Sequence, residues 1–323
     1  SFMGQILPLA LDKGTKLISN GGGVNPRSAG QHIINDLRAR ERFGAKVAVV
    51  TGDDLLERID ELISAGIPLE NMETGETNFL DIRDRILSAN AYIDASGIIA
   101  GLGQGAAIVI TGRVSDNGVY VGPMMHEFGW RHDTANVHNI AAAITFGHIA
   151  ECAAAITGGM SSRFDDMPNM GEAGFPILEV AEDASAAFTK LPGTGGVVDE
   201  FSIKEHLVYE VHDPRAYIMP DGIANFTSLK LAETDPDTVV VSDVKGSPQP
   251  DNYKAIIGYQ DGWIGESISY FPWPRAYDRA VKARETMLER LKKLGLKAEQ
   301  IHFDFIGLNM LHGPAAPDPN PDF

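Results

Sequence analysis

The sequence contains a single cysteine in 323 residues, and this scarcity excludes an intramolecular disulfide framework and a cysteine-rich zinc site. It also lacks a membrane-spanning run, because no apolar stretch reaches the roughly 18 residues that a transmembrane helix requires. No signal peptide is visible at its start. The low cysteine content fits a reducing compartment, so we expect a cytoplasmic protein.

Basic residues are few as well. The chain has 27 Lys and Arg against 44 Asp and Glu, which gives a formal net charge of −17. A nucleic acid or an anionic membrane requires a basic surface, so we expect neither as a partner, although a local basic pocket for a phosphorylated ligand stays open. The apolar content of 44% is typical of a globular protein.

The most informative stretch lies between Gly105 and Gly159. Its apolar run over residues 106–111 predicts a buried strand, and ligands of open α/β sheets bind beyond the carboxyl ends of the strands. The residues that follow this strand supply a glycine, a cation, a hydroxyl, a carboxylate and an amide: Gly112, Arg113, Ser115, Asp116 and Asn117. We predict that they form a binding site; the alternative is an ordinary turn in which Ser115 or Asp116 caps the next helix.

A glycine-rich loop follows an earlier short strand over residues 16–19. Its candidate ligand-binding residues are Gly21, Gly22, Gly23 and Asn25, and Pro26 suits the first turn of a helix. A loop of this kind at a helix N-terminus can bind an anion, but the pattern is neither a Walker loop nor G-x-G-x-x-G. We expect it to line the same cavity as Gly112 to Asn117, or else to be a tight turn that requires glycine.

Two further strands are predicted before this site. The valine-rich run at residues 46–50 is typical of a buried parallel strand, and Asp53 or Asp54 behind it is expected to cap a helix over residues 55–64. The aspartate pair could instead bind a ribose or a metal. With a strand at 86–93 and a short helix at 95–104, the alternation of strands and helices predicts a largely parallel sheet flanked by helices.

A long apolar helix is predicted over residues 133–155. His148, Glu151 and Cys152 have the spacing of one helix face, and a histidine beside a carboxylate can perform acid–base chemistry. The alternative is that His148 and Cys152 are packed in the core. The pattern H-x-x-E-C is not a zinc signature, and we expect no metal site.

The last third of the chain predicts an antiparallel layer added to the parallel sheet. Residues 253–259 and 263–270 flank Q-D-G, which indicates a hairpin, and a helix over residues 275–294 and a strand over 301–308 follow. The predicted fold class is therefore α/β, with a largely parallel sheet and a C-terminal antiparallel layer. We expect a parallel part over residues 1–175 and a mixed part over 176–323, or one continuous domain.

Several ordered motifs carry a resemblance to a known family. They are N-G-G-G-V-N-P, V-V-T-G-D-D, A-N-A-Y, I-V-I-T-G-R-V-S-D-N, G-H-I-A-E-C-A-A-A-I-T-G-G and Y-E-V-H-D-P. From about Lys13 to His312 the chain resembles the acyclic terpene utilisation AtuA family. The resemblance implies an α/β fold and a place in the catabolism of branched or isoprenoid acids as acyl-CoA thioesters. An N-terminal glycine-rich segment and a C-terminal extension usual in the family look absent, which leaves open a truncated chain or one subunit of a split protein.

We therefore expect an enzyme, of lyase or hydratase type, that acts on a carboxylate or an acyl-CoA substrate without a further cofactor. Hydration, dehydration or carbon–carbon lysis next to a carbonyl needs an acid–base group and donors for the oxyanion. Asp116 with His148 or Glu151 would move protons, and Arg113 would bind a carboxylate or phosphate. A homo-oligomer or a complex with a partner subunit is expected. The alternative function is a non-catalytic subunit or scaffold of an acyl-CoA-processing complex.

Overall fold

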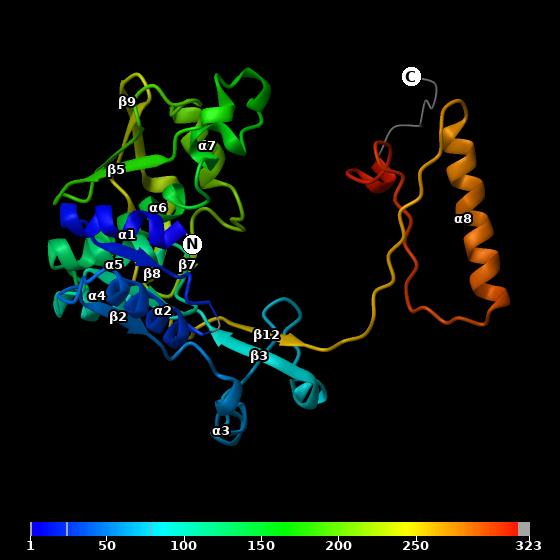
Figure 1. Ribbon diagram of the computed structural model, residues 1–323, viewed down its shortest axis with the longest axis horizontal. Helices are drawn as coiled ribbons and strands as arrows, with labels where there is room; N and C mark the ends of the chain where they lie inside the picture. Colours follow the sequence, from blue (N-terminus) through cyan, green and yellow to red (C-terminus); the bar gives the residue numbers. More distant parts are fainter. Residues whose placement is uncertain (1, 24, 78, 316–323) are drawn as a thin grey trace. The chain divides into compact units, whose positions relative to one another are not determined.

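The computed structural model describes residues 2–23, 25–77 and 79–315 (Figure 1). The contacts group the chain into two compact units, Ser1–Gln260 and Asp261–Phe323. A subdivision into residues 1–175 and 176–323 stays a prediction. None of the helices in the described ranges combines the length and the apolar content needed to cross a lipid bilayer.

A three-stranded parallel sheet forms the N-terminal part of the first unit. Its strands are β1 (Leu17–Ser19), β4 (Ile108–Thr111) and β2 (Val47–Val50), in the order β1–β4–β2. Both pairings are parallel, and all four residues of the central strand β4 are buried. The strands predicted over residues 106–111 and 46–50 and their parallel pairing are confirmed, and β4 is buried as expected, whereas in β2 only Val50 is buried.

Helices cover both faces of this sheet. Side chains alternate along a strand, so Ile108 and Ile110 pack on one face with residues of α1 (Phe2–Lys13) and α2 (Pro26–Ala39). Val109 points to the other face, towards α4 (Ser96–Gly103). The valine-rich and isoleucine-rich composition of β4 follows from this burial on two sides.

The predicted antiparallel layer is present in the C-terminal part of the first unit. One sheet has the order β5–β6–β10–β9, with strands Pro176–Val180, Ala186–Lys190, Thr238–Ser242 and Lys230–Asp235. A second has the order β11–β8–β7, with strands Lys245–Ser247, Gly222–Asn225 and Tyr217–Met219. All pairings in these two sheets are antiparallel.

The predicted hairpin over residues 253–270 is wrong. The strand β12 (Ala255–Tyr259) pairs antiparallel with β3 (Ile86–Ala91), which was expected in the parallel sheet, and the two run side by side in Figure 1. Residues 263–270 form no strand. The pairing with β3 prevails because it places Ile257 on a small core made by Ile59, Phe79 and Ala89, and this burial outweighs a local turn signal.

Helix α6 (Val137–Ala150) is shorter than the predicted helix over residues 133–155, and every residue from Ile140 to Ala150 is buried. It begins late because Asp133 Oδ1 accepts hydrogen bonds from the backbone N–H groups of the two residues before the helix. It ends early because Cys152 and Ala153 adopt left-handed φ angles of 61° and 55°. Glu151 and Cys152 therefore lie outside the helix.

Helix α6 packs among neighbours on several sides. They are α5 (Gly118–Phe128), α7 (Glu200–Leu207) and the strands β5, β8 and β11. A helix that is apolar on all faces, as α6 is, belongs inside a core.

A short helix, α3 (Ile59–Ser64), follows β2 and begins after a 3₁₀ turn at Leu56–Arg58.

In the second unit, α8 spans Ala276–Lys293, within one residue at each end of the helix predicted at 275–294. Its described residues are half-buried or exposed, and none is buried. Residues 301–308, predicted as a strand, are irregular. A period-two pattern cannot form a strand by itself, because the backbone donors and acceptors of a strand need a paired neighbour.

Glycines allow α4 to lie directly on β2, and this contact yields a matched test. A Cβ at Gly101 would lie 2.7 Å from the Ala48 Cβ, whereas a Cβ at Gly103 would have open space. We expect Gly101→Ala to lower the free energy of unfolding by about 1–3 kcal/mol through overpacking. Gly103→Ala should be neutral or stabilising by up to about 1 kcal/mol. Urea unfolding of the two variants measures both, and equal effects would contradict the packing argument.

Candidate functional site

The loops that follow β1 and β4 meet at one edge of the parallel sheet, because neighbouring parallel strands end on the same side. Asn20 Nδ2 donates to Asp116 Oδ1 at 3.0 Å. Gly22 lies so close to the Thr111 carbonyl and Pro26 that a Cβ would collide with them. The structure thus brings together the glycine-rich loop and the loop from Gly112 to Asn117.

Within the glycine-rich loop, the individual residues have structural tasks. Asn25 Oδ1 accepts from Ser28 N at 2.9 Å and caps α2, which begins at Pro26 as predicted. Gly21 N donates to Ser19 Oγ. Gly23 has a φ of 50°, which glycine adopts at no steric cost. Asn25 therefore serves as a helix cap, and the exposed Gly21 and Gly23 are the parts of the loop open to a ligand.

Asp53 anchors the loop that carries the site. The residue is 2% exposed, and its Oδ2 accepts from Arg113 N at 2.8 Å and from Asn90 Nδ2 at 3.1 Å. Gly112 sits directly against this carboxylate, where a Cβ would clash. Asp53 or Asp54 is expected to cap the following helix, and Asp53 does not, because its carboxylate holds this loop. Asp54 makes the local bond instead, accepting from Leu56 N at 3.0 Å.

The remaining predicted residues of this loop differ in exposure. Arg113 and Asp116 are exposed, whereas Ser115 and Asn117 are each 1% exposed. In the described ranges, Ser115 Oγ and Asn117 Oδ1 are buried without a hydrogen-bond partner. Neither Ser115 nor Asp116 caps α5, whose N-cap is Asn117 without a side-chain bond. The alternative of a simple capped turn therefore does not account for these side chains.

Two cations gather beside this loop at Tyr92. The Arg113 guanidinium lies 5.3 Å from the centroid of the Tyr92 ring, and Lys254 Nζ lies 5.4 Å from it. Both side chains are exposed. On a chain of strongly negative charge, this pair forms a local basic spot at the sheet edge.

His148 is buried among aromatic rings. Its ring centroid lies 4.8 Å from that of Tyr217, 5.1 Å from His206 and 5.4 Å from Phe226. His148 Nδ1 lies 3.2 Å from Glu151 Oε1. The predicted histidine–carboxylate pair is therefore formed, although Glu151 follows the helix end and Cys152 is exposed.

Tyr217 is affected both by Asp116 of the loop after β4 and by Glu151 of the His148–Glu151 pair. Burial raises the pKa of the Tyr217 phenol, and the carboxylates of Glu151, Asp116 and Glu210 raise it further. Burial and the same carboxylates also raise the pKa of the Cys152 thiol. The charges of Asp116 and Glu151 thus both act on the phenol of Tyr217, which lies on β7. No local sequence pattern marks Tyr217, because its position depends on a strand from another part of the chain.

A second polar cluster was not predicted. Asp221 is 2% exposed, and its Oδ1 accepts from Ala95 N at 3.0 Å and lies 3.1 Å from His132 Nε2. In the described part of the chain, Asp221 Oδ2 has no hydrogen-bond partner. Asp94, one residue before Ala95, accepts from the Tyr253 hydroxyl at 2.9 Å. These residues come from four separate loops, so no local sequence motif predicts the cluster.

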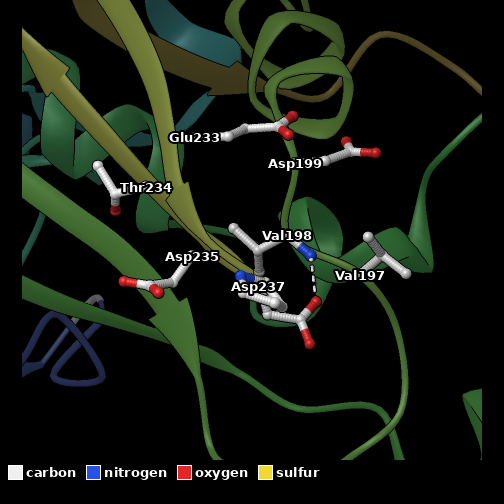
Figure 2. Close-up of a pocket in the computed structure, with 8 residues that line it drawn as sticks. Val197, Val198, Asp199, Glu233, Thr234, Asp235 and Asp237 are labelled. Carbon is white, nitrogen blue, oxygen red and sulfur yellow. Dashed lines mark hydrogen bonds between the residues drawn. The ribbon is translucent and has the colours of Figure 1, made fainter.

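Figure 2 shows a surface hollow on the C-terminal part of the first unit. It is lined by residues 197–199 and 233–237. Asp237 Oδ1 accepts from Val198 N at 3.0 Å, as the dashed line shows, and Asp199 caps α7. These carboxylates hold the fold, and none of the predicted site residues lines the hollow.

The fold defines an α/β protein of the class in which ligands bind beyond the carboxyl ends of parallel strands. Over residues 1–321 the chain matches the model of the acyclic terpene utilisation family protein AtuA. It belongs to this family, and the match is longer than the resemblance between Lys13 and His312. No curated protein and no solved structure matches the chain.

The role of Asp53 as an anchor can be tested by truncation. Asp53→Ala leaves the Arg113 N–H and the Asn90 amide without their acceptor, so we expect the free energy of unfolding to fall by at least about 2 kcal/mol. Asp54→Ala, at an exposed neighbour, should cost at most about 1 kcal/mol. Denaturant unfolding of both variants checks this, and equal losses would refute the anchor.

The cluster of His132 and Asp221 predicts a pH dependence of stability. Burial raises the pKa of Asp221, and the hydrogen bond to Asp221 raises the pKa of His132. Both shifts mean that the folded chain binds protons more tightly than the unfolded chain. The free energy of unfolding therefore falls as the pH rises from the ordinary pKa of each group through its raised value.

Asp221→Asn removes both contributions, so the fall in unfolding free energy between about pH 5 and pH 8 should become shallower. Urea unfolding at several pH values measures this slope. Asp235→Asn, on the exposed end of β9, is the matched control and should keep the slope of the parent chain. An unchanged slope in Asp221→Asn would show that the cluster does not hold the extra protons.

Proposed function

We propose that this protein is an enzyme of acyclic terpene utilisation that moves protons next to a carbonyl group. Its substrate would be a branched or isoprenoid carboxylate or CoA thioester, and the reaction a hydration, a dehydration or a carbon–carbon lysis. The observation that carries the proposal is the His148–Glu151 pair packed against Tyr217, whose phenol has its pKa raised by burial and by the carboxylates of Glu151 and Asp116. Family membership supplies the metabolic setting.

Asp116 and Glu151 are the groups best placed to exchange protons with a substrate. Asp116 is exposed and is held by the bond from Asn20, and Glu151 is half-buried beside His148. His148 itself is 1% exposed, with both ring nitrogens engaged. It is therefore a positioning residue that acts through Glu151, while Tyr217 supplies a hydroxyl that stays protonated at neutral pH.

The substrate's anionic part would bind at the basic spot formed by Arg113 and Lys254. A guanidinium can hold a carboxylate or phosphate through two parallel hydrogen bonds, and the exposed glycines Gly21 and Gly23 leave the backbone accessible nearby. No nucleotide or other organic cofactor enters this proposal beyond the CoA that a substrate carries. The enzyme would work in the cytoplasm, as a homo-oligomer or with a partner subunit.

The first experiment is a substrate search. Purified protein is incubated with a panel of branched and isoprenoid acids and their CoA thioesters, and products are detected by mass spectrometry. A mass change of one water, or the release of a carbon fragment, would support the proposal. Tight binding of a thioester without any turnover across the panel would favour a non-catalytic subunit instead.

Asp116→Asn then tests the proton transfer. Asparagine keeps the oxygen that accepts from Asn20 but removes the charge, so the melting temperature should stay nearly unchanged while turnover falls about 10²-fold or more. Asp84→Asn, at an exposed position on the 3₁₀ turn before β3, is the control and should retain full turnover. Wild-type turnover in Asp116→Asn would rule out Asp116 as the base and leave Glu151.

A further inference from the structure

The contact between His148 and Glu151 lacks a hydrogen when the His148 ring is neutral. His148 Nε2 lies 3.1 Å from the His206 carbonyl oxygen, and a carbonyl only accepts, so Nε2 carries the hydrogen. In a neutral ring, Nδ1 then has a lone pair, and it faces the Glu151 carboxylate at 3.2 Å. Two acceptors at this distance repel unless a cation lies between or beside them.

His206 is held in the matching form. Its Nε2 donates to the His148 carbonyl at 2.8 Å, so its Nδ1 also carries a lone pair when the ring is neutral. A backbone carbonyl that fixes the tautomer of a histidine is the usual outer support of a metal ligand.

We infer that His148, Glu151 and His206 together bind a divalent transition-metal ion such as zinc. One potential ligand atom from each residue lies within 4.8 Å of the others. Ligands about 2.0–2.1 Å from one ion need an adjustment of roughly 1 Å from this spacing. Two imidazoles and one carboxylate are a donor set that suits zinc and leaves a coordination position open.

The surroundings favour a cation over a single bridging proton. A proton would satisfy the His148–Glu151 contact alone, whereas an ion would also bind His206, which has a potential ligand atom within 4.8 Å of those of the other two residues. The sequence predicts no metal, because the third ligand comes from α7 and H-x-x-E-C is not a metal signature.

This inference deepens the proposed function and rests on it for its chemical meaning. An ion with an open position would polarise the carbonyl of the substrate and stabilise the oxyanion that forms when a proton leaves the neighbouring carbon. Glu151 would then serve as a ligand, and Asp116 would remain the base. Binding of the ion can be measured without any substrate, so the two ideas can fail separately.

The experiment uses the untagged full chain after dialysis against a chelator, with circular dichroism to confirm that it is folded. Co²⁺ is titrated while visible absorption is recorded, and Zn²⁺ uptake is measured by elemental analysis. We expect one ion per chain. Glu151→Gln and His206→Gln should each weaken Co²⁺ binding by at least about 10- to 100-fold, and His132→Gln, in the other histidine–aspartate pair, should bind as the parent does.

A measurement on the unmodified chain covers the event that a variant does not fold. Zn²⁺ should shift the imidazole ¹⁵N resonances of His148 and His206 and leave those of His132 in place. Absence of uptake by the folded protein, or undiminished uptake by both folded variants, would overturn the inference. Metal uptake at this site with no turnover of any substrate would support the metal site and contradict the proposed function.

Discussion

Burial of α6 on all sides is the constraint on which the arrangement of this protein depends. Every residue from Ile140 to Ala150 is inside the core, so the helix must be built from small and apolar side chains wherever its neighbours approach. Gly147 lies against Asn117 and leaves no room for a Cβ. His148 is the only ionisable side chain among these residues, and its presence in such a helix requires partners for both ring nitrogens. The packing of α6 thereby fixes the position of His148. Glu151, the first residue after the helix, is half-buried.

The edge of the parallel sheet depends on a different device, the buried carboxylate that holds a loop. Asp53 holds the backbone of Arg113, and Asp221 holds that of Ala95. The Arg113 loop follows β4 of the parallel sheet, and the Ala95 loop follows β3, which pairs with β12. In both loops the backbone N–H group would otherwise be unpaired. A carboxylate can accept several such bonds at once. The exposed Arg113 and Asp116 thus belong to a loop whose backbone is held by the Asp53 carboxylate.

The sequence was sufficient for features that depend on local pattern and on the geometry of parallel strands. The strand ending at Thr111, the helix beginning at Pro26, and the meeting of the two loops all follow from such patterns. The pairing of β3 with β12, and the arrival of Tyr217 and His206 beside His148, do not. Each joins segments that are far apart in the chain, and a one-dimensional pattern carries no information on which segments will meet. The end of α6 was missed because two non-glycine residues adopt left-handed angles, which propensity disfavours.

The exchanged bonds between His148 and His206 have a consequence for motion. Each imidazole reaches the carbonyl of the other residue, and both carbonyls lie in the last turn of a helix, where acceptors are normally left over. Two reciprocal hydrogen bonds therefore join the ends of α6 and α7. Fraying of one helix would remove a hydrogen bond from the end of the other, so the two ends should open together and exchange their amide hydrogens as one cooperative unit.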